Sequence, residues 1–171
     1  MVLKNFILII IITILFVFPV NAKQISVDNI EKIFKNNLPE CNEIIYTKVP
    51  RGLIISIDEK VFFDECELNI KENSFYILDI LAGIIKNLPN RFIIEDHVRN
   101  ECTENLAPWE ISMIRASNIS EYFLKYKGIS NEQIFDIGFG GFMPFKDNVT
   151  GGAAPLNNRV DFIIIEYEVK R

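Results

Sequence analysis

The chain has 171 residues, of which 18 are basic and 23 acidic, and its formal net charge is −5. The acidic balance and the absence of basic runs argue against a nucleic-acid partner. A single histidine and three cysteines without C-x-x-C spacing argue against a zinc site, so no metal and no cofactor are expected. After a hydrophobic N-terminal segment, the length leaves room for one domain of about 120 residues.

Residues 1–22 are predicted to be a signal peptide or a membrane anchor. Lys4 precedes the uncharged stretch Asn5–Ala22, which is rich in Ile, Leu, Phe and Val. Its Val-Asn-Ala ending suits cleavage after Ala22, the alternative that we favour. The stretch also approaches the length of a membrane span. Both alternatives export the rest of the chain, and membrane contact is expected only if the segment stays uncleaved.

Residues 23–50 are interpreted as a lead-in or linker with a short helix. Asp28–Asn37 carries apolar residues at helical spacing and acidic residues in its first turn. We expect one face of this helix to pack against the domain that follows.

Residues 51–168 are predicted to form that domain. In chain order the expected elements are a broken or bulged strand over 53–63, a helix over 73–86, a strand over 91–96, a helix over 108–127, a strand over 133–139 and a strand over 160–169. The stripe expected to be buried on the first helix is Ile77, Leu78, Leu81, Ile84 and Ile85. The order β-α-β-α-β-β predicts an α/β (α+β) fold, a two-layer sandwich with two main helices on a mixed sheet.

The second of these helices carries a charge on its apolar face. Pro108 suits its first position and Gly128 its C-terminal cap. At 100° per residue the apolar face contains Ile111, Ala116, Ile119, Tyr122, Phe123 and Tyr126. Ser112 and Arg115 fall on the same face, and a buried guanidinium needs partners because an unpaired buried charge is costly. Arg115 lies about two turns from the helix start, so we expect its partners in the loop His97–Ala107.

Several stretches resemble the OmpA-like domain family. Trp109–Ala116 is similar to the family pattern NxxLSxxRAxxV, Gly138–Pro144 to GYGxxxP, and Asn157–Asp161 to NRRVE. The family includes the C-terminal domain of outer membrane protein A, peptidoglycan-associated lipoprotein and the periplasmic domain of the flagellar stator B subunit. The resemblance runs from Arg51 to Tyr167 and implies the same two-layer fold.

The resemblance implies a non-enzymatic cell-envelope protein that binds peptidoglycan non-covalently through the diaminopimelate residue of the stem peptide. In the family, the aspartate of a GHTD turn takes the ammonium and the arginine of the RA pair takes the α-carboxylate. Arg115 matches that arginine, but Arg99 stands at the aspartate's position. At about 4 Å this reversal of charge costs several kcal/mol at a surface-like dielectric. Diaminopimelate binding by the usual geometry is therefore expected to be weak.

Three alternatives follow from Arg99. Asp96 or Glu101 takes the ammonium, or the ligand is more anionic, or only the scaffold is retained. The residues implied around the ligand are Asp96, His97, Arg99, Asn100, Ser112, Arg115, Asn157 and Arg159. For Arg115 a purely structural role, bonding loop carbonyls, is an equal alternative.

The second functional hypothesis is a structural protein–protein module of an envelope-spanning machine that has lost peptidoglycan binding. Arg99 and further departures from the family pattern motivate it, among them Pro108 in place of a motif asparagine and Asn158 in place of an arginine. The partner is then an envelope protein, and a homodimer remains open. No carboxylate pair and no nucleophile with a base stands out in the loops, so no enzymatic activity is expected.

The cysteines and the export signal define the expected compartment. Cys66 and Cys102 map to loops that flank the family's cleft, which suggests a disulfide between them. Free thiols, or pairing that involves Cys41, remain open. The expected location is the periplasm or cell envelope of a Gram-negative-type bacterium, with anchoring by residues 5–22 as the alternative.

Overall fold

The computed structural model of the chain describes residues 25–40, 43–99, 105–144 and 157–166. The predictions for residues 1–22, for Asn100 and Glu101, and for Cys41 and Cys102 lie outside these ranges. Within the described ranges, no helix combines the length and the apolar character needed to cross a membrane.

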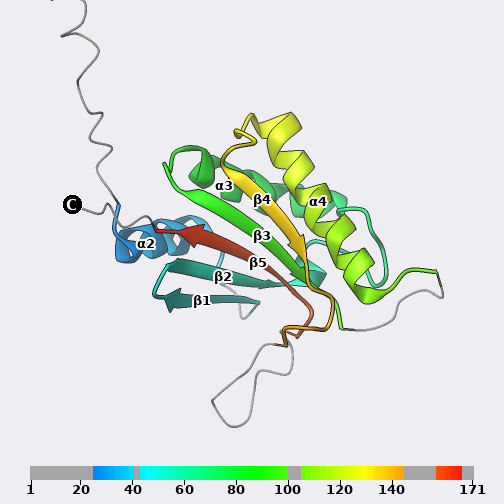
Figure 1. Cartoon of the computed structure of the whole chain (residues 1–171). Coiled ribbons are helices and arrows are strands. Elements are labelled where there is room, and N and C mark those ends of the chain that lie inside the picture. Colours follow the sequence, from blue (N-terminus) through cyan, green and yellow to red (C-terminus); the bar gives the residue numbers. More distant parts are fainter. Residues whose placement is uncertain (1–24, 41–42, 100–104, 145–156, 167–171) are drawn as a thin grey trace, which may run out of the picture.

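Five strands form one mixed sheet, on which three helices pack (Figure 1). The elements are α2 (Val27–Asn37), β1 (Ile44–Val49), β2 (Gly52–Asp58), the 3-10 turns η1 (Glu59–Val61) and η2 (Glu72–Ser74), α3 (Phe75–Lys86), β3 (Arg91–His97), α4 (Pro108–Lys127), β4 (Ile134–Gly138) and β5 (Arg159–Ile165). The strand order is β1-β2-β5-β3-β4. Only the β3–β4 pairing is parallel. The predicted α+β sandwich is confirmed.

One face of the sheet and the three helices share a single hydrophobic core. Alternate residues of β2 and β5, such as Ile55 and Phe162, meet Phe34 of α2, Leu81 of α3 and Phe123 of α4. All five side chains are at most 1% exposed. The helices therefore cover the same side of the sheet.

The opposite side of the sheet is partly apolar. Ile54, Ile163 and Ile93 lie side by side on β2, β5 and β3, because Ile163 is the register partner of both of the others. Each is half-buried and lies outside the hydrophobic core. An antiparallel sheet with one solvated face usually alternates apolar with polar residues, so this isoleucine row departs from the common pattern.

The lead-in contains a strand that the sequence analysis did not assign. Ile44–Val49 forms β1, which pairs antiparallel with β2 along its whole length. Its alternation is weak because Thr47 and Lys48 are exposed at the sheet edge, and charged side chains are common on edge strands. The expected helix in the lead-in is present as α2, and its Ile30 and Phe34 are fully buried.

The strand expected at Val61–Phe63 was wrong. β2 ends at Asp58, whose carboxylate accepts a hydrogen bond from the Lys60 backbone N–H at 2.9 Å. Such a local side-chain bond replaces ladder pairing and starts a turn. Phe62 and Phe63 are nevertheless buried, so the apolar pattern located core residues but not their secondary structure.

The buried faces of the two main helices were predicted with errors at their margins. On α4, Ile111, Ala116, Ile119 and Phe123 are fully buried, but Tyr126 is 72% exposed. On α3, Ile77 and Ile84 are only half-buried, whereas Ala82 is buried. Gly128 caps α4 in the left-handed conformation (φ 66°), as expected.

Candidate functional site

Three strand ends and the start of a helix meet at one end of the sheet. The last residues of β2 and β3, Asp58 and His97, both face Arg159, the first residue of β5. α4 begins nearby, because Gly138 at the end of β4 and Gly140 just after it lie against its first turns. The candidate site is this end of the sheet.

Arg115 of α4 points inward and is 1% exposed, as predicted. Its Nη1 donates to Glu59 Oε2 at 2.7 Å, its Nε to the Glu67 carbonyl at 2.7 Å and its Nη2 to the Asp64 carbonyl at 3.2 Å. The guanidinium also lies 4.7 Å from the centre of the Phe63 ring. Its described partners come from the connection after β2 and not from the loop 97–107, where they were expected.

Asn158 connects this ion pair to the loop after β3. Its Oδ1 accepts a hydrogen bond from the Arg99 backbone N–H at 2.9 Å, and its Nδ2 donates to Glu59 Oε1 at 2.8 Å. Glu59 is therefore held on one side by Asn158 and on the other by Arg115. Glu59 and the role of Asn158 were not predicted from the sequence, because they depend on contacts between residues 56 and 99 positions apart in the chain.

Asp96 is a fully buried acid with no hydrogen-bond partner for either carboxylate oxygen among the described residues. Burial raises the pKa of Asp96 to about 8. The charge of Arg115 lowers this pKa and that of Glu59 raises it, but both effects are smaller than that of burial. A carboxyl with this pKa is mostly protonated at neutral pH. Asp96 therefore contributes little negative charge to the site.

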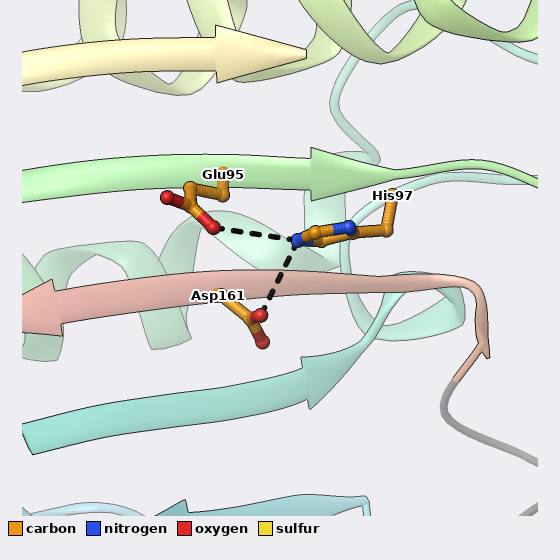
Figure 2. Close-up of side chains that lie close together, drawn as sticks. All are labelled: Glu95, His97 and Asp161. Carbon is orange, nitrogen blue, oxygen red and sulfur yellow. Dashed lines mark ion pairs between the residues drawn. The ribbon is translucent and has the colours of Figure 1, made fainter. Parts of the chain in front are cut away.

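Figure 2 shows that Glu95, His97 and Asp161 point toward one another on the face opposite the helices. His97 Nε2 lies 3.3 Å from Asp161 Oδ2 and 3.6 Å from Glu95 Oε2. Burial alone would lower the pKa of His97, but hydrogen bonds to the two carboxylates raise it above the ordinary value. Burial would raise the pKa of Asp161, but His97 and Arg159 hold it below the usual range.

Glu95, His97 and Asp161 lie as close together as the ligands of a metal ion would. Arg159 nevertheless makes metal binding by these residues unfavourable. Its Nε donates to Asp161 Oδ2 at 2.9 Å, and its Nη2 lies 3.3 Å from His97 Nε2. A cation bound by His97 and Asp161 would have to compete with this buried guanidinium for the same ligand atoms. We therefore interpret the cluster as an ion-pair network that fixes the end of β5 against β3.

Ser112 joins the start of α4 to the turn after β4. Its hydroxyl donates to the Trp109 carbonyl at 3.0 Å and accepts from the Gly140 backbone N–H at 2.8 Å. At Gly138 a Cβ would lie 2.2 Å from the Met113 backbone nitrogen, so the glycine is needed for this close approach. The glycine motif is thus explained by backbone packing.

The residues implied by the family resemblance do not form one cluster. Asp96, Ser112 and Arg115 lie on the helix side of the sheet, whereas His97 and Arg159 lie on the opposite side. This division could have been found in the sequence, because successive residues of a strand point to opposite faces.

Arg99, Asn157 and Cys66 are the remaining described residues for which the sequence predicted a role. Arg99 is exposed, and the buried Oδ1 of Asn157 makes no hydrogen bond among the described residues. Cys66 is disulfide-bonded. Its pairing with Cys102 stays a prediction.

Comparisons with known proteins agree with the resemblance. No family model matches the chain. It is 30% identical over 117 residues to the uncharacterised protein YtxE of Bacillus subtilis, a match that covers 67% of this chain and 48% of that protein. The chain spans about half the length of the curated relatives that head the comparison, 48% and 58%.

Two solved structures show the same fold. A MotB-like protein from Desulfovibrio vulgaris has a TM-score of 0.70 at 20% identity, covering 82% of this chain and 91% of its own. The cell wall anchor of the T6SS from Pseudomonas aeruginosa has a TM-score of 0.69 at 12% identity, covering 83% and 100%. Together with the order of the sequence motifs, these comparisons show that the chain has the OmpA-like domain fold.

Proposed function

We propose that this chain is a non-enzymatic cell-envelope protein that binds peptidoglycan non-covalently, with a carboxylate of the stem peptide as the principal ligand group. The observation that carries the proposal is Arg115, a buried guanidinium at the position that matches the family's carboxylate-binding arginine. The structural similarity to a cell wall anchor supports it. A guanidinium fork suits a planar carboxylate because it offers two parallel N–H donors.

In the proposed mode, Glu59 stands in for the ligand carboxylate. Its Oε2 already occupies Arg115 Nη1 at 2.7 Å, so a ligand carboxylate would exchange with it. Arg99 is exposed and adds positive charge at the loop after β3. Asp96 is mostly protonated at neutral pH because burial raises its pKa to about 8, so it offers little negative charge to an ammonium. The site is therefore expected to prefer the anionic end of the stem peptide over its ammonium.

Co-sedimentation with isolated sacculi tests this proposal. The full-length protein should sediment with sacculi, and Arg115→Ala and Arg99→Ala should each reduce the bound fraction. Because Arg115 is buried, circular dichroism should verify that its variant is folded, while exposed Arg99 provides a variant that leaves the core intact. Lys32→Ala, at an exposed position on α2, is the matched control. Equal sedimentation of all four proteins, or of none, would overturn the proposal.

A second candidate function is a structural module that docks on an envelope protein. The observation that favours it is a group of exposed apolar side chains near the start of α4. Trp109 is 48% exposed and Met113 38%, while Phe142 and Met143 in the turn after β4 are 79% and 53% exposed. The turn adjoins Trp109, because a Cβ on Gly140 would lie 2.7 Å from the Trp109 nitrogen. Photocrosslinking from position 142 in cells tests it; capture of wall fragments without protein would count against docking.

We propose an exported, envelope location with cleavage after Ala22. The solved relatives include a cell wall anchor and periplasmic MotB domains, which supports an envelope location in general. The mass of the mature protein tests the cleavage, since Lys23 would become its first residue.

A homodimer is proposed through the row of Ile54, Ile93 and Ile163, because a second copy could bury this apolar face. Analytical ultracentrifugation of wild type and Ile163→Lys would show a dimer that the substitution dissociates.

A further inference from the structure

A groove of about 350 Å³ lies between the start of α3 and the middle of α4, away from the proposed stem-peptide site. It is lined by Asn69, Ile70, Phe75, Asn118, Glu121, Tyr122 and Tyr126. Three of these residues are aromatic, three carry amide or carboxylate groups, and Ile70 is aliphatic. Its volume is at the lower end of the range of small-ligand sites.

The aromatic wall of the groove combines Tyr122, whose ring is held by its neighbours, with Tyr126, whose ring is exposed to solvent. The Tyr122 ring lies 4.7 Å from Phe75 and 5.7 Å from Tyr126. The Tyr122 hydroxyl donates to Asp79 Oδ1 at 2.6 Å, and Lys127 binds the same carboxylate at 2.6 Å. Tyr126, in contrast, is 72% exposed. A ring held in place by neighbours but open to solvent can bind a ligand with little loss of conformational entropy.

Polar groups stand next to this platform. Asn118 uses its Nδ2 to bind the Leu68 carbonyl at 2.8 Å, which fixes the amide against the wall of the groove. Asn69 and Glu121 are exposed, and Glu121 is paired with Lys125. The groove thus offers amide donors and oxygen acceptors without an unpaired cation that would select an anion.

We propose that this groove binds a neutral pyranose sugar, specifically an N-acetylated residue of the glycan strand. One face of a pyranose ring is made of C–H groups that pack on an aromatic ring, while its hydroxyl and acetamido groups pair with amides and carboxylates. The inference rests on the proposed function, in which peptidoglycan is the ligand. It adds a contact with the sugar chain to the contact with the stem peptide.

The two sites are arranged along one helix. Arg115, Asn118, Tyr122 and Tyr126 follow one another at spacings of three or four residues, so they share one side of α4. From Arg115 to Tyr122 the helix rises by about 10 Å. A stem peptide and the sugar from which it branches could therefore contact the same helix together.

Titration of the full-length protein with chitotetraose, a glycan that carries no stem peptide, tests the inference. Two-dimensional NMR should show binding, and Tyr126→Ala should weaken it about ten-fold, because truncating a central aromatic contact commonly costs more than 1 kcal/mol. Tyr126→Phe should retain affinity within about two-fold. Tyr76→Ala, at a 70% exposed tyrosine outside the groove, is the matched control and should have no effect.

A parallel titration with free stem peptide separates this inference from the proposed function. Binding of chitotetraose that depends on Tyr126 supports the sugar site, whatever the peptide does. Absence of chitotetraose binding, or binding that Tyr126→Ala leaves unchanged, overturns it, even if the stem peptide binds. Loss of peptide binding alone would instead count against the stem-peptide site.

Discussion

Glu59 and Arg115 form the central ion pair of the candidate site. Glu59 Oε2 lies 2.7 Å from Arg115 Nη1, with side-chain exposures of 14% and 1%. The pair joins the turn after β2 to α4, and it places a carboxylate where the family resemblance expects that of a ligand. In the proposed binding mode, stability and ligand binding would both depend on these two residues.

Glu59→Gln should lower the free energy of unfolding by about 3 kcal/mol, because it leaves the buried guanidinium without its counter-charge. Urea denaturation measures the change. Glu121→Gln is the control, since it removes an exposed pair with Lys125 and should cost less than about 1 kcal/mol. Equal denaturation midpoints for the two variants would contradict a structural role for the Glu59–Arg115 pair.

The same Glu59 variant should strengthen binding to sacculi, provided that it remains folded. If the ligand carboxylate has to displace Glu59, removing the charge of the competitor lowers the cost of exchange. Co-sedimentation under conditions where the variant is folded checks this result. Weaker binding by folded Glu59→Gln would show that Glu59 supports the ligand site and does not compete with the ligand.

Arg99→Asp should weaken binding of a stem peptide by about ten-fold. The substitution replaces attraction of the ligand carboxylate by repulsion, and a surface charge contact at about 4 Å is worth on the order of 1 kcal/mol or more. Arg99 is exposed, so the fold should be unaffected. Isothermal titration calorimetry provides the measurement, with Lys32→Asp as the control of equal charge change. A loss no greater than that of the control would show that position 99 does not contact the ligand carboxylate.

Asp96 should make the protein less stable as the pH rises. Its pKa is about 8 in the folded state against an ordinary 3.8, so between these values the folded protein holds a proton that the unfolded chain releases. The unfolded state then binds fewer protons, and stability falls by up to about 1.4 kcal/mol per pH unit over this window.

Asp96→Asn tests this assignment because it removes the titrating group but keeps the shape. Denaturation of both proteins from pH 5 to pH 8 should give a flatter profile for the variant and a gain in stability relative to wild type that grows with pH. Parallel profiles would mean that Asp96 ionises at an ordinary pKa or finds a partner.

His97 should titrate above its ordinary pKa of 6.5, owing to the Asp161 and Glu95 carboxylates. A raised pKa in the folded state contributes stability below pH 6.5 that is lost as the pH rises through the folded value. His97 is the only histidine, so proton NMR reports its pKa directly. Asp161→Asn should lower this pKa, and a wild-type value at or below 6.5 would contradict the network in Figure 2.

Gly138→Ala should destabilise the protein by about 2 kcal/mol or more, because the new Cβ would lie 2.2 Å from the Met113 backbone nitrogen. Gly83 provides a matched control within α3. Nothing lies within 4 Å of a Cβ built there, so Gly83→Ala should stabilise the helix by about 0.5–1 kcal/mol. Thermal unfolding of both variants measures the difference, and a neutral Gly138→Ala would mean that α4 can move away from β4.

The fold was predictable wherever local physics and tertiary packing favour the same structure. Helical periodicity identified α3 and α4, and Gly128 marked the end of α4 because a left-handed cap suits glycine. β1 was missed because its local pattern is weak and its pairing with β2 defines it. Val61 was assigned to a strand because apolar composition alone does not distinguish a strand from a buried turn.

The candidate site was less predictable than the fold. The sequence by itself determined that Arg115 faces inward, because residue spacing fixes the side of a helix on which a side chain lies. Only the tertiary structure decided that Glu59 would pair with Arg115 and Asn158 with Glu59, and that Asp96 and His97 would belong to separate clusters. Ion pairs depend on where distant segments come together in space, and periodicity along one segment carries no information about that distance.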